Sequence, residues 1–529
     1  MKSEGRDKLV LGALLALAFL LGCFPMADFD VWWHLGTAQL ILHDRAVPRV
    51  DVLTYTNAGR PWIDLYWLFQ LVIALLYRIG GATALVLLKA FAGLGIVALA
   101  LRSRRPNAVA WIAALVWLPA LVALSGRLCE RPELFSLLFL CSYLTILSHA
   151  PAKPRRLWLL PLLQILWVNC HGFFVMGPLL IGAYACEVIH NARKRRFDRN
   201  PPVRTLILSG LATLLACTVS PYGIRAVMLP IEQFHKLGDS GLYQKNIGEF
   251  KSLGDFIAVD GFKNPYLLSI FALFILGVAS FVLELRRREL HPFRLILFMA
   301  ASYLGWQASR NSALFAVVAA TVACWNFDHV APPLPAVSVG KSRKRGPLPP
   351  VTRPRSWNGL ALAGVASLAL LVLSGGLYAW AGEGRTVGLG ERPRWFAHGA
   401  CRFLAQSGPE RIVAFNLGQA AVCMVHASPE HKLFIDPRLE VNSADTFERY
   451  LAGLRRLWRG QPDWESPLGI DYARPDELPA LLIERGVLAR AADMLARDPR
   501  WRCVFADAVA VVFVPSVFAD ARGLAAVQR

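Results

Sequence analysis

Two aspartates separated by one residue, Asp28 and Asp30, stand directly after the first long apolar stretch of the sequence. In an extended segment, residues two apart point to the same side, so the two carboxylates would form a pair. Such a pair can supply a general base with its orienting partner, or hold a hard divalent cation such as Mg²⁺ or Mn²⁺. His34, which follows in the same segment, is a further candidate for proton transfer. The alternative is that the acidic residues merely mark where the chain leaves an apolar environment.

Other polar residues stand at the ends of later apolar stretches. Arg127 and Arg131 lie in one short connection, Asn169 and His171 in a second, and Arg310 in a third. Arginine binds phosphate oxygens well, and polar groups near membrane depth usually line a cavity. We therefore expect these residues to share one cavity with the aspartates. Each of them could instead lie in the headgroup layer or cap a helix end.

Membrane helices are the elements that must position these residues. The 529 residues are 55% hydrophobic and 18% charged, whereas soluble domains are about 25% charged. The mean hydropathy is +0.42. This composition excludes ordinary cytosolic enzymes, disordered chains and small secreted domains. The net charge of +20 lies almost wholly in the first 380 residues, because the remainder has 19 Lys and Arg against 18 Asp and Glu.

Eleven apolar runs are long enough, or nearly long enough, to cross a bilayer. They are residues 9–27, 82–101, 108–125, 134–150, 157–168, 173–190, 203–219, 265–285, 293–308, 312–327 and 360–380. Basic clusters separate them at residues 2–8, 102–105, 153–156, 193–199, 286–294 and 328–355. With a cytoplasmic amino terminus, all six clusters fall on the cytoplasmic side, as the positive-inside rule requires. A nucleic-acid surface would instead gather its basic residues on one folded face.

The domain boundaries follow from this topology. Residues 66–77 are too few to cross and are flanked by Asp64 and Arg78, which predicts a re-entrant or interfacial helix. The predicted parts are a transmembrane domain over residues 1–330 with its first external loop at 28–64, a cytoplasmic basic linker over 331–356, a last transmembrane helix over 357–380, and an extracytoplasmic α/β domain over 381–529.

The tail after the last span alternates apolar runs with helical stretches, which is typical of an α/β domain. Strands are expected at residues 411–415, 421–425, 432–435, 501–505 and 508–514, and helices at 394–406, 443–458 and 487–496. Its three cysteines, Cys401, Cys423 and Cys503, permit at most one disulfide within the tail.

Several short motifs follow one another in an order that is known from other proteins. They are Asp-Phe-Asp-Val-Trp-Trp-His-Leu-Gly at residues 28–36, Pro-Arg-Val-Asp at 48–51, Gly-Arg-Pro-Trp at 59–62, Trp-Val-Asn-Cys-His-Gly at 167–172, Ser-Pro-Tyr-Gly at 220–223, Ser-Arg-Asn at 309–311 and Phe-Ile-Asp-Pro-Arg at 434–438. In these motifs the sequence resembles bacterial polytopic membrane proteins related to the GT-C glycosyltransferases.

The resemblance implies a GT-C-like helical fold and transfer of a sugar from a polyprenyl-phosphate donor to an extracytoplasmic glycan, lipid or protein acceptor. It also implies that the catalytic acidic residue is Asp28 or Asp30, of which we favour Asp30, and that a metal is used only in some members. Two positions depart from the pattern. Tyr66 stands where members often have a Glu, with Asp64 two positions earlier, so the resemblance assigns no second catalytic carboxylate, and Pro437 replaces a frequent Gly.

The residues are compatible with this chemistry. Loss of the sugar leaves a phosphate at membrane depth, which the three outer arginines could neutralise. Trp32, Trp33 and Trp62 could stack on sugar rings, although anchoring at the membrane interface is the stronger expectation. Two other functions stay open at this point. One is a noncatalytic scaffold of envelope polysaccharide or glycolipid assembly, and the other is a transporter of lipid-linked saccharide. The expected location is the bacterial inner membrane.

Overall fold

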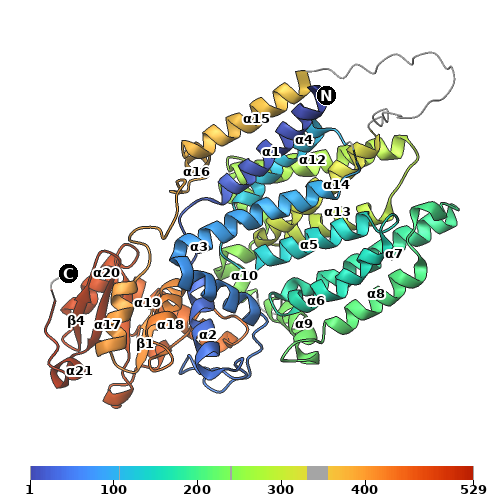
Figure 1. Ribbon diagram of the computed structural model, residues 1–529. Coiled ribbons are helices and arrows are strands. Elements are labelled where there is room, and N and C mark those ends of the chain that lie inside the picture. The colour runs from blue at the N-terminus through green and yellow to red at the C-terminus, as the bar shows by residue number, and fades with distance from the viewer. Residues whose placement is uncertain (1, 107, 239–240, 331–355, 528–529) are drawn as a thin grey trace, which may run out of the picture.

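The structure is a computed structural model that describes residues 2–106, 108–238, 241–330 and 356–527. A bundle of long helices occupies one part of the molecule, and a small α/β domain lies at one end of it (Figure 1). The amino terminus lies at the opposite end of the bundle. Residues 331–355 of the predicted basic linker lie outside the described residues.

Each predicted span contains a helix of the bundle. The helices are α1 (Lys2–Gly22), α3 (Trp67–Arg102), α4 (Ala110–Ser125), α5 (Glu133–Ser148), α6 (Leu159–Val168), α7 (Met176–Arg193), α8 (Val203–Ala216), α12 (Pro265–Arg286), α13 (Pro292–Gln307), α14 (Ser312–Val330), and α15 (Ser356–Leu373) with α16 (Gly376–Trp380). Within the described ranges, four helical stretches are long and apolar enough to cross a membrane: α3, residues Gly172–Arg193, α12 and residues Ser309–Val330. The chain is thus a multi-pass membrane protein, and the count of eleven crossings stays a prediction.

The outward faces of the bundle are apolar. On α8, Ile207, Leu211 and Leu215 are 55%, 53% and 71% exposed. Such a continuous apolar face is costly in water and suits contact with lipid chains. The bundle therefore has the surface of a membrane domain.

Residues 67–79 form the first arm of α3 rather than a separate helix. Gly80 and Gly81 interrupt its helical geometry, and Gly81 has a φ of 57°, a value that favours glycine. The short helix expected at residues 66–77 therefore exists as this arm, and its depth in the membrane stays a prediction.

The first external loop contains a helix that the sequence analysis did not predict. α2 (Asp30–Asp44) begins at the second aspartate, so the extended conformation expected there is wrong. The helix forms because Val31, Trp32 and Leu35 bury one of its faces against α3 and the α/β domain. At Gly36 a Cβ atom would lie 3.0 Å from Met424, so the close approach of α2 to helix α18 requires glycine.

The α/β domain has a mixed five-stranded sheet with the order β2-β1-β3-β5-β4. Strand β1 is parallel to β2 and β3, whereas β5 is antiparallel to β3 and β4. Its elements are α17 (His398–Ser407), β1 (Arg411–Ala414), α18 (Leu417–His426), β2 (Lys432–Leu433), α19 (Ala444–Trp458), β3 (Ala480–Glu484), α20 (Ala489–Arg497), β4 (Trp501–Ala506), β5 (Ala510–Pro515) and α21 (Ser516–Ala521).

One local prediction in this domain is wrong, and one strand was not predicted. The expected strand at 421–425 lies within α18, because the Asn416 side chain accepts from the backbone N–H groups of Gly418 and Gln419 and starts a helix there. The central strand β3 was missed, although its run Ala-Leu-Leu-Ile-Glu is apolar. A disulfide joins Cys401 to Cys423 and ties α17 to α18.

A buried ion triad fastens the α/β domain to the first external loop. Arg438 donates to Asp51 Oδ1 at 2.6 Å and to Asp436 Oδ2 at 2.5 Å, and all three side chains are fully buried. The guanidinium also lies 4.2 Å from the centre of the Trp62 ring. The loop and the domain therefore form one continuous body.

Candidate active site

A cavity of about 810 Å³ lies between the bundle and the α/β domain. Its walls come from the end of α1, the start of α2, the turn between α4 and α5, the short helix η4 (Gly248–Phe250), and the tail segments 382–395 and 437–440. Beneath it, Lys89 of α3 forms a buried ion pair of 2.7 Å with Glu130 and donates to the Phe24 carbonyl at 3.1 Å. These contacts fix the α4–α5 turn against the end of α1.

Both aspartates of the first loop contact Arg131 of this turn. Arg131 Nη2 donates to Asp28 Oδ1 at 3.0 Å, and Nε donates to the other oxygen of the same carboxylate. Arg131 Nη1 lies 3.1 Å from Asp30 Oδ2. The Asp30 N–H donates to Asp28 Oδ1 at 3.0 Å, which orients the first carboxylate from its own backbone. The paired carboxylates expected from the spacing are therefore present, although α2 and not an extended strand brings them together.

The two carboxylates differ in their affinity for a proton. Burial alone would raise the pKa of Asp28, but the charge and hydrogen bonds of Arg131 outweigh it and lower the pKa. Burial raises the pKa of Asp30 to about 7; the charge of Arg131 offsets part of this rise, and the negative charges of Asp28 and Glu249 add to it. Asp28 is therefore a fixed anion, and Asp30, whose side chain is 32% exposed, is the carboxylate able to exchange a proton in the cavity.

The three predicted arginines meet in the cavity, and each has an acidic partner. Glu249 Oε1 accepts from Arg131 Nη1 at 2.6 Å and from Arg127 Nη1 at 3.1 Å. Glu133 accepts from Arg127 Nη2 at 3.2 Å and from Arg310 Nη2 at 3.4 Å. The sequence predicted these cations but not their acidic partners: Glu133 follows Arg131 by two positions and was not considered, whereas Glu249 comes near the arginines only in the fold.

Further charged residues of the cavity come from segments that the sequence analysis did not consider. Arg385 and Arg392 line it from the tail, and Lys236 lines it from helix α9 (Ile224–Gly238). Arg385 pairs with Glu383 at 2.9 Å. The sequence could have indicated the two arginines as cavity residues, because they follow the last predicted span on its predicted outer side.

His34 lines the cavity, but it lies against Gln70 rather than Asp30. Its Nδ1 is 3.4 Å from Gln70 Nε2, and Gln70 donates to Asp64 Oδ1 at 3.0 Å. Burial and the charge of Arg131 lower the pKa of His34 well below its usual value, so the imidazole is neutral. Burial raises the pKa of Asp64 to about 7. Asp64 thus lies behind the cavity wall, and the Gln70 side chain links it to His34.

Of the remaining predicted residues, four lie outside the cavity lining: His171, Asn169, Trp32 and Trp62. His171 Nδ1 is hydrogen-bonded to the Ser136 hydroxyl at 2.8 Å, and burial lowers the pKa of this histidine to about 4. Asn169 accepts from Trp67 Nε1 at 2.8 Å and donates to backbone carbonyls, which is a structural role. Trp32 and Trp62 are each 1% exposed, so neither can anchor the loop in the membrane interface, whereas Trp33 lines the cavity.

A divalent cation fits the aspartate pair poorly. The Arg131 guanidinium contacts both carboxylates and already supplies the positive charge that a cation would bring. Within the part of the chain that the structure describes, the side chains grouped closely enough to hold a metal ion are Glu284, His291 and His329, outside this cavity.

The fold resembles that of a solved oligosaccharyltransferase. No family model matches the sequence, and no curated protein matches it. AglB of Archaeoglobus fulgidus, in complex with an inhibitory peptide and a dolichol-phosphate, superposes with a TM-score of 0.55 at 12% identity, covering 93% of this chain and 71% of AglB. The apo form of the Archaeoglobus fulgidus enzyme superposes with a TM-score of 0.54 at 12% identity, covering 94% of this chain and 73% of that enzyme. ArnT from Cupriavidus metallidurans bound to undecaprenyl phosphate superposes with a TM-score of 0.46 at 14% identity, covering 96% of this chain and 97% of ArnT. This TM-score does not establish a common fold.

The molecule therefore has a fold like that of a solved membrane glycosyltransferase, and at the level of the fold the resemblance inferred from the sequence is confirmed. More particularly, one of the solved structures that it resembles over nine-tenths of its length is an oligosaccharyltransferase.

Proposed function

We propose that this chain is a membrane glycosyltransferase that moves a sugar from a polyprenyl-phosphate carrier to an acceptor on the side of the α/β domain. The observation that carries the proposal is the pair Asp28 and Asp30 on Arg131, with one carboxylate held as an anion and the other with a raised pKa. Neighbouring carboxylates whose pKa values are driven apart are characteristic of acid–base catalysis. The fold supports the proposal, because AglB has been solved with a dolichol-phosphate and a peptide.

The proposed reaction is a single displacement at the anomeric carbon of the donor sugar. An acceptor hydroxyl or amide attacks this carbon and forms the new glycosidic bond, while the bond to the carrier phosphate breaks and its electron pair leaves with the phosphate. Asp30 takes the proton of the acceptor. Asp28 keeps Arg131 in place and, through its charge, keeps the Asp30 carboxylate basic.

The outer arginines are proposed to bind the phosphate. Their positive charges are already matched by Glu249 and Glu133, so an arriving phosphate must replace a carboxylate. Glu249 is the better candidate for displacement, because its side chain is 29% exposed and lies on the short helix η4, whereas Glu133 is 14% exposed in the first turn of α5. We therefore infer that Glu249 occupies the phosphate position when no donor is bound.

A second cavity of about 410 Å³ suits the lipid chain of the carrier. It shares Arg127 and Glu249 with the polar cavity, and its other walls include Leu253, Phe256 and Ile270. An isoprenoid chain in this space would bring its phosphate to Arg127. The position of the phosphate at the junction of an apolar and a charged cavity is what an amphiphilic donor requires.

We further infer that the amino terminus is cytoplasmic and that the α/β domain lies outside the cytoplasm, in the inner membrane of a bacterium. A cysteine introduced at Val487, which is 64% exposed in the α/β domain, tests this in a chain whose exposed and partly exposed free cysteines have been replaced by Ser, namely Cys23, Cys129 and Cys186. The engineered cysteine should react with a membrane-impermeant maleimide in cells whose outer barrier is opened and whose inner membrane is intact. Reaction only after lysis of the inner membrane contradicts the orientation.

Complementation of a deletion strain tests the enzymatic function. The strain should accumulate a polyprenyl-phosphate sugar and lack the glycosylated product, and the wild-type gene should reverse both changes. The double variant Asp28→Asn, Asp30→Asn keeps the side-chain shapes and should reverse neither at normal protein level. A scaffold or a transporter needs no base, so full complementation by the double variant would overturn the proposal.

A further inference from the structure

A cluster of two histidines and two glutamates lies at the end of the bundle that is far from the cavity. Glu284 is in the last turn of α12, His291 directly precedes α13, and His329 is in the last turn of α14. Glu187 of α7 joins them through His291. α12 has 22 residues, so at 1.5 Å per residue this cluster is about 30 Å from the start of the helix, where Tyr266 and Leu267 line the second cavity.

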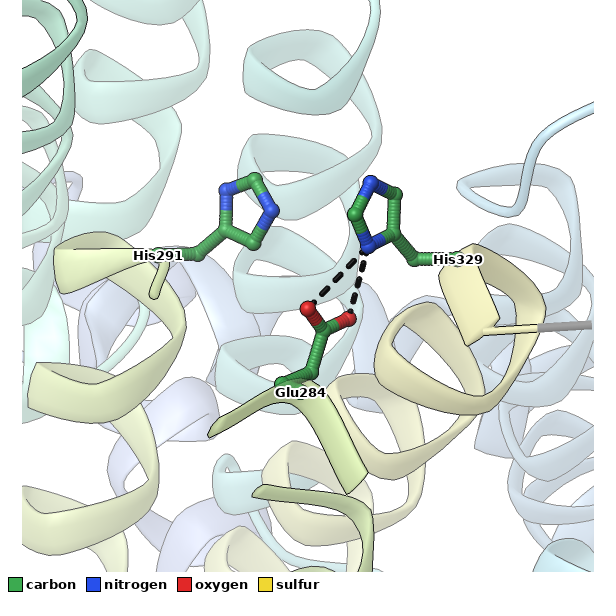
Figure 2. A group of neighbouring side chains, drawn as sticks. All are labelled: Glu284, His291 and His329. Carbon is green, nitrogen blue, oxygen red and sulfur yellow. Dashed lines mark hydrogen bonds and ion pairs between the residues drawn. The ribbon is translucent and has the colours of Figure 1, made fainter. Parts of the chain in front are cut away.

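The three side chains point toward one another from the ends of two helices and from the residue before a third (Figure 2). One ligand atom from each of Glu284, His291 and His329 lies within 4.8 Å of the others. His329 Nδ1 is 3.0 and 3.1 Å from the two oxygens of Glu284. A tetrahedral zinc ion with bonds of about 2 Å holds its ligands about 3.3 Å apart, so a small closure of these side chains completes the geometry.

His291 is prepared as a metal ligand by its other contact. Its Nδ1 lies 2.7 Å from Glu187 Oε1, and a carboxylate there holds the proton on Nδ1. The lone pair is then on Nε2, which is buried and has no hydrogen-bond partner among the described residues. A carboxylate that orients a metal-bound histidine through its second nitrogen is a recurrent feature of zinc sites.

We propose that Glu284, His291 and His329 bind a divalent transition metal ion of the zinc type, with Glu187 as the positioning residue for His291. Imidazole ligands favour zinc over the hard cations Mg²⁺ and Ca²⁺, and one carboxylate gives the His₂Glu set known from zinc proteins. His329 is 30% exposed, so water can take the fourth position. The ion ties the ends of α12, α13 and α14 together.

One positive charge opposes the ion. Arg294 Nη1 lies 3.4 Å from Glu284 Oε1 and donates to Asn326 Oδ1 at 3.0 Å. Because Asn326 holds this guanidinium on one oxygen of Glu284, the second oxygen, Oε2, is the one that binds the metal. Removal of the charge in Arg294→Gln should therefore strengthen metal binding.

The test is metal binding to the purified full-length chain in detergent after treatment with a chelator. Zn²⁺ alone should bind at one ion per chain in calorimetry and raise the unfolding temperature. Co²⁺ alone, as a spectroscopic substitute, should give the intense visible bands of a four-coordinate site. Glu284→Gln and His329→Gln should abolish these bands, and Glu187→Gln should weaken Zn²⁺ binding about 10- to 100-fold.

Two matched controls assign the ion to this cluster. His149→Asn changes a histidine that ends α5, and His398→Asn breaks the other histidine pair, His398 with His426. Both control variants should bind Zn²⁺ as the wild type does. All variants are compared only as monodisperse protein. If a ligand variant fails to fold, the conservative Glu187→Gln variant, which changes no ligand, still tests Zn²⁺ binding at this cluster. The proposal is overturned if Zn²⁺ does not bind stoichiometrically, or if Glu284→Gln binds it as tightly as the wild type. The cluster would then be a network of hydrogen bonds and ion pairs without a metal.

Discussion

Replacement of Asp30 by Asn should remove the proton acceptor of the transfer reaction while leaving its partner in place. Asn keeps the shape of the side chain, and Arg131 retains its two hydrogen bonds to Asp28. Loss of a general base lowers the rate about 100- to 10,000-fold. At 1.36 kcal/mol per tenfold, this is about 2.7 to 5.4 kcal/mol of transition-state stabilisation.

Asp28→Asn should act differently, because Asp28 touches Arg131 and not the acceptor. Hydrogen bonds to a charged group are worth about 1.5 to 3 kcal/mol, so the loss of this anchor should lower kcat/KM about 10- to 150-fold. The Asp28 charge also raises the pKa of Asp30, and its removal leaves Arg131, which already lies 3.1 Å from Asp30, with one fewer competing carboxylate. Both effects lower the pKa of the base.

The pH profile separates the two roles. A base works only when deprotonated, so wild-type kcat/KM should fall as the pH drops through the raised pKa of Asp30. This acid limb should move to lower pH in Asp28→Asn and disappear in Asp30→Asn. The assay follows transfer of labelled sugar by purified variants, with the lipid extract of the deletion strain as donor. An Asp30→Asn enzyme with an unchanged acid limb and activity within threefold of wild type refutes the assignment of the base.

Four other perturbations follow from contacts in the structure. Glu249→Gln removes the carboxylate that competes for Arg127 and Arg131, and it should tighten binding of undecaprenyl phosphate about 5- to 30-fold in native mass spectrometry, for a gain of about 1 to 2 kcal/mol. Arg310→Ala should weaken donor use by about 1.5 to 3 kcal/mol, and an unchanged KM would assign this arginine to a structural role. Cys401→Ser opens the link to Cys423 and should lower the free energy of unfolding by about 2 to 4 kcal/mol in denaturant titrations. Arg438→Met leaves two buried carboxylates without a cation and should cost about 3 to 5 kcal/mol, unless the Asp51→Asn, Asp436→Asn double change restores stability.

The sequence predicted the membrane helices well, because their signal is local. An apolar run needs no partner to be recognised, and each predicted span contains a helix. The same locality explains why the gathering of Asp28, Arg131 and Arg310 was predicted. Each follows or precedes a predicted span on the same side of the predicted topology, so this topology alone brings them to one face.

Contacts between segments that are distant in the sequence could not be predicted from it. Arg131 and Glu249 are 118 positions apart, and no periodicity links them. The tryptophans show the same limit. Trp32 and Trp62 have the composition of interface anchors, but the α/β domain covers the first loop and buries them. α2 was missed for a related reason, because the partner that buries its apolar face lies in the tail.

The ion triad of Asp51, Arg438 and Asp436 has a consequence for how the protein is made. Asp51 and Arg438 are 387 positions apart, and at about 5 to 20 residues per second the ribosome needs roughly 20 to 80 s to add the second after the first. In the proposed topology the first loop crosses the membrane during that interval, while its aspartate and Trp62 are still without the cation that later covers them. A ribosome that stalls before Arg438 therefore releases a chain whose membrane part is inserted but whose loop exposes an acidic and aromatic surface. Such a surface marks an incomplete chain for the chaperones and proteases on that side of the membrane.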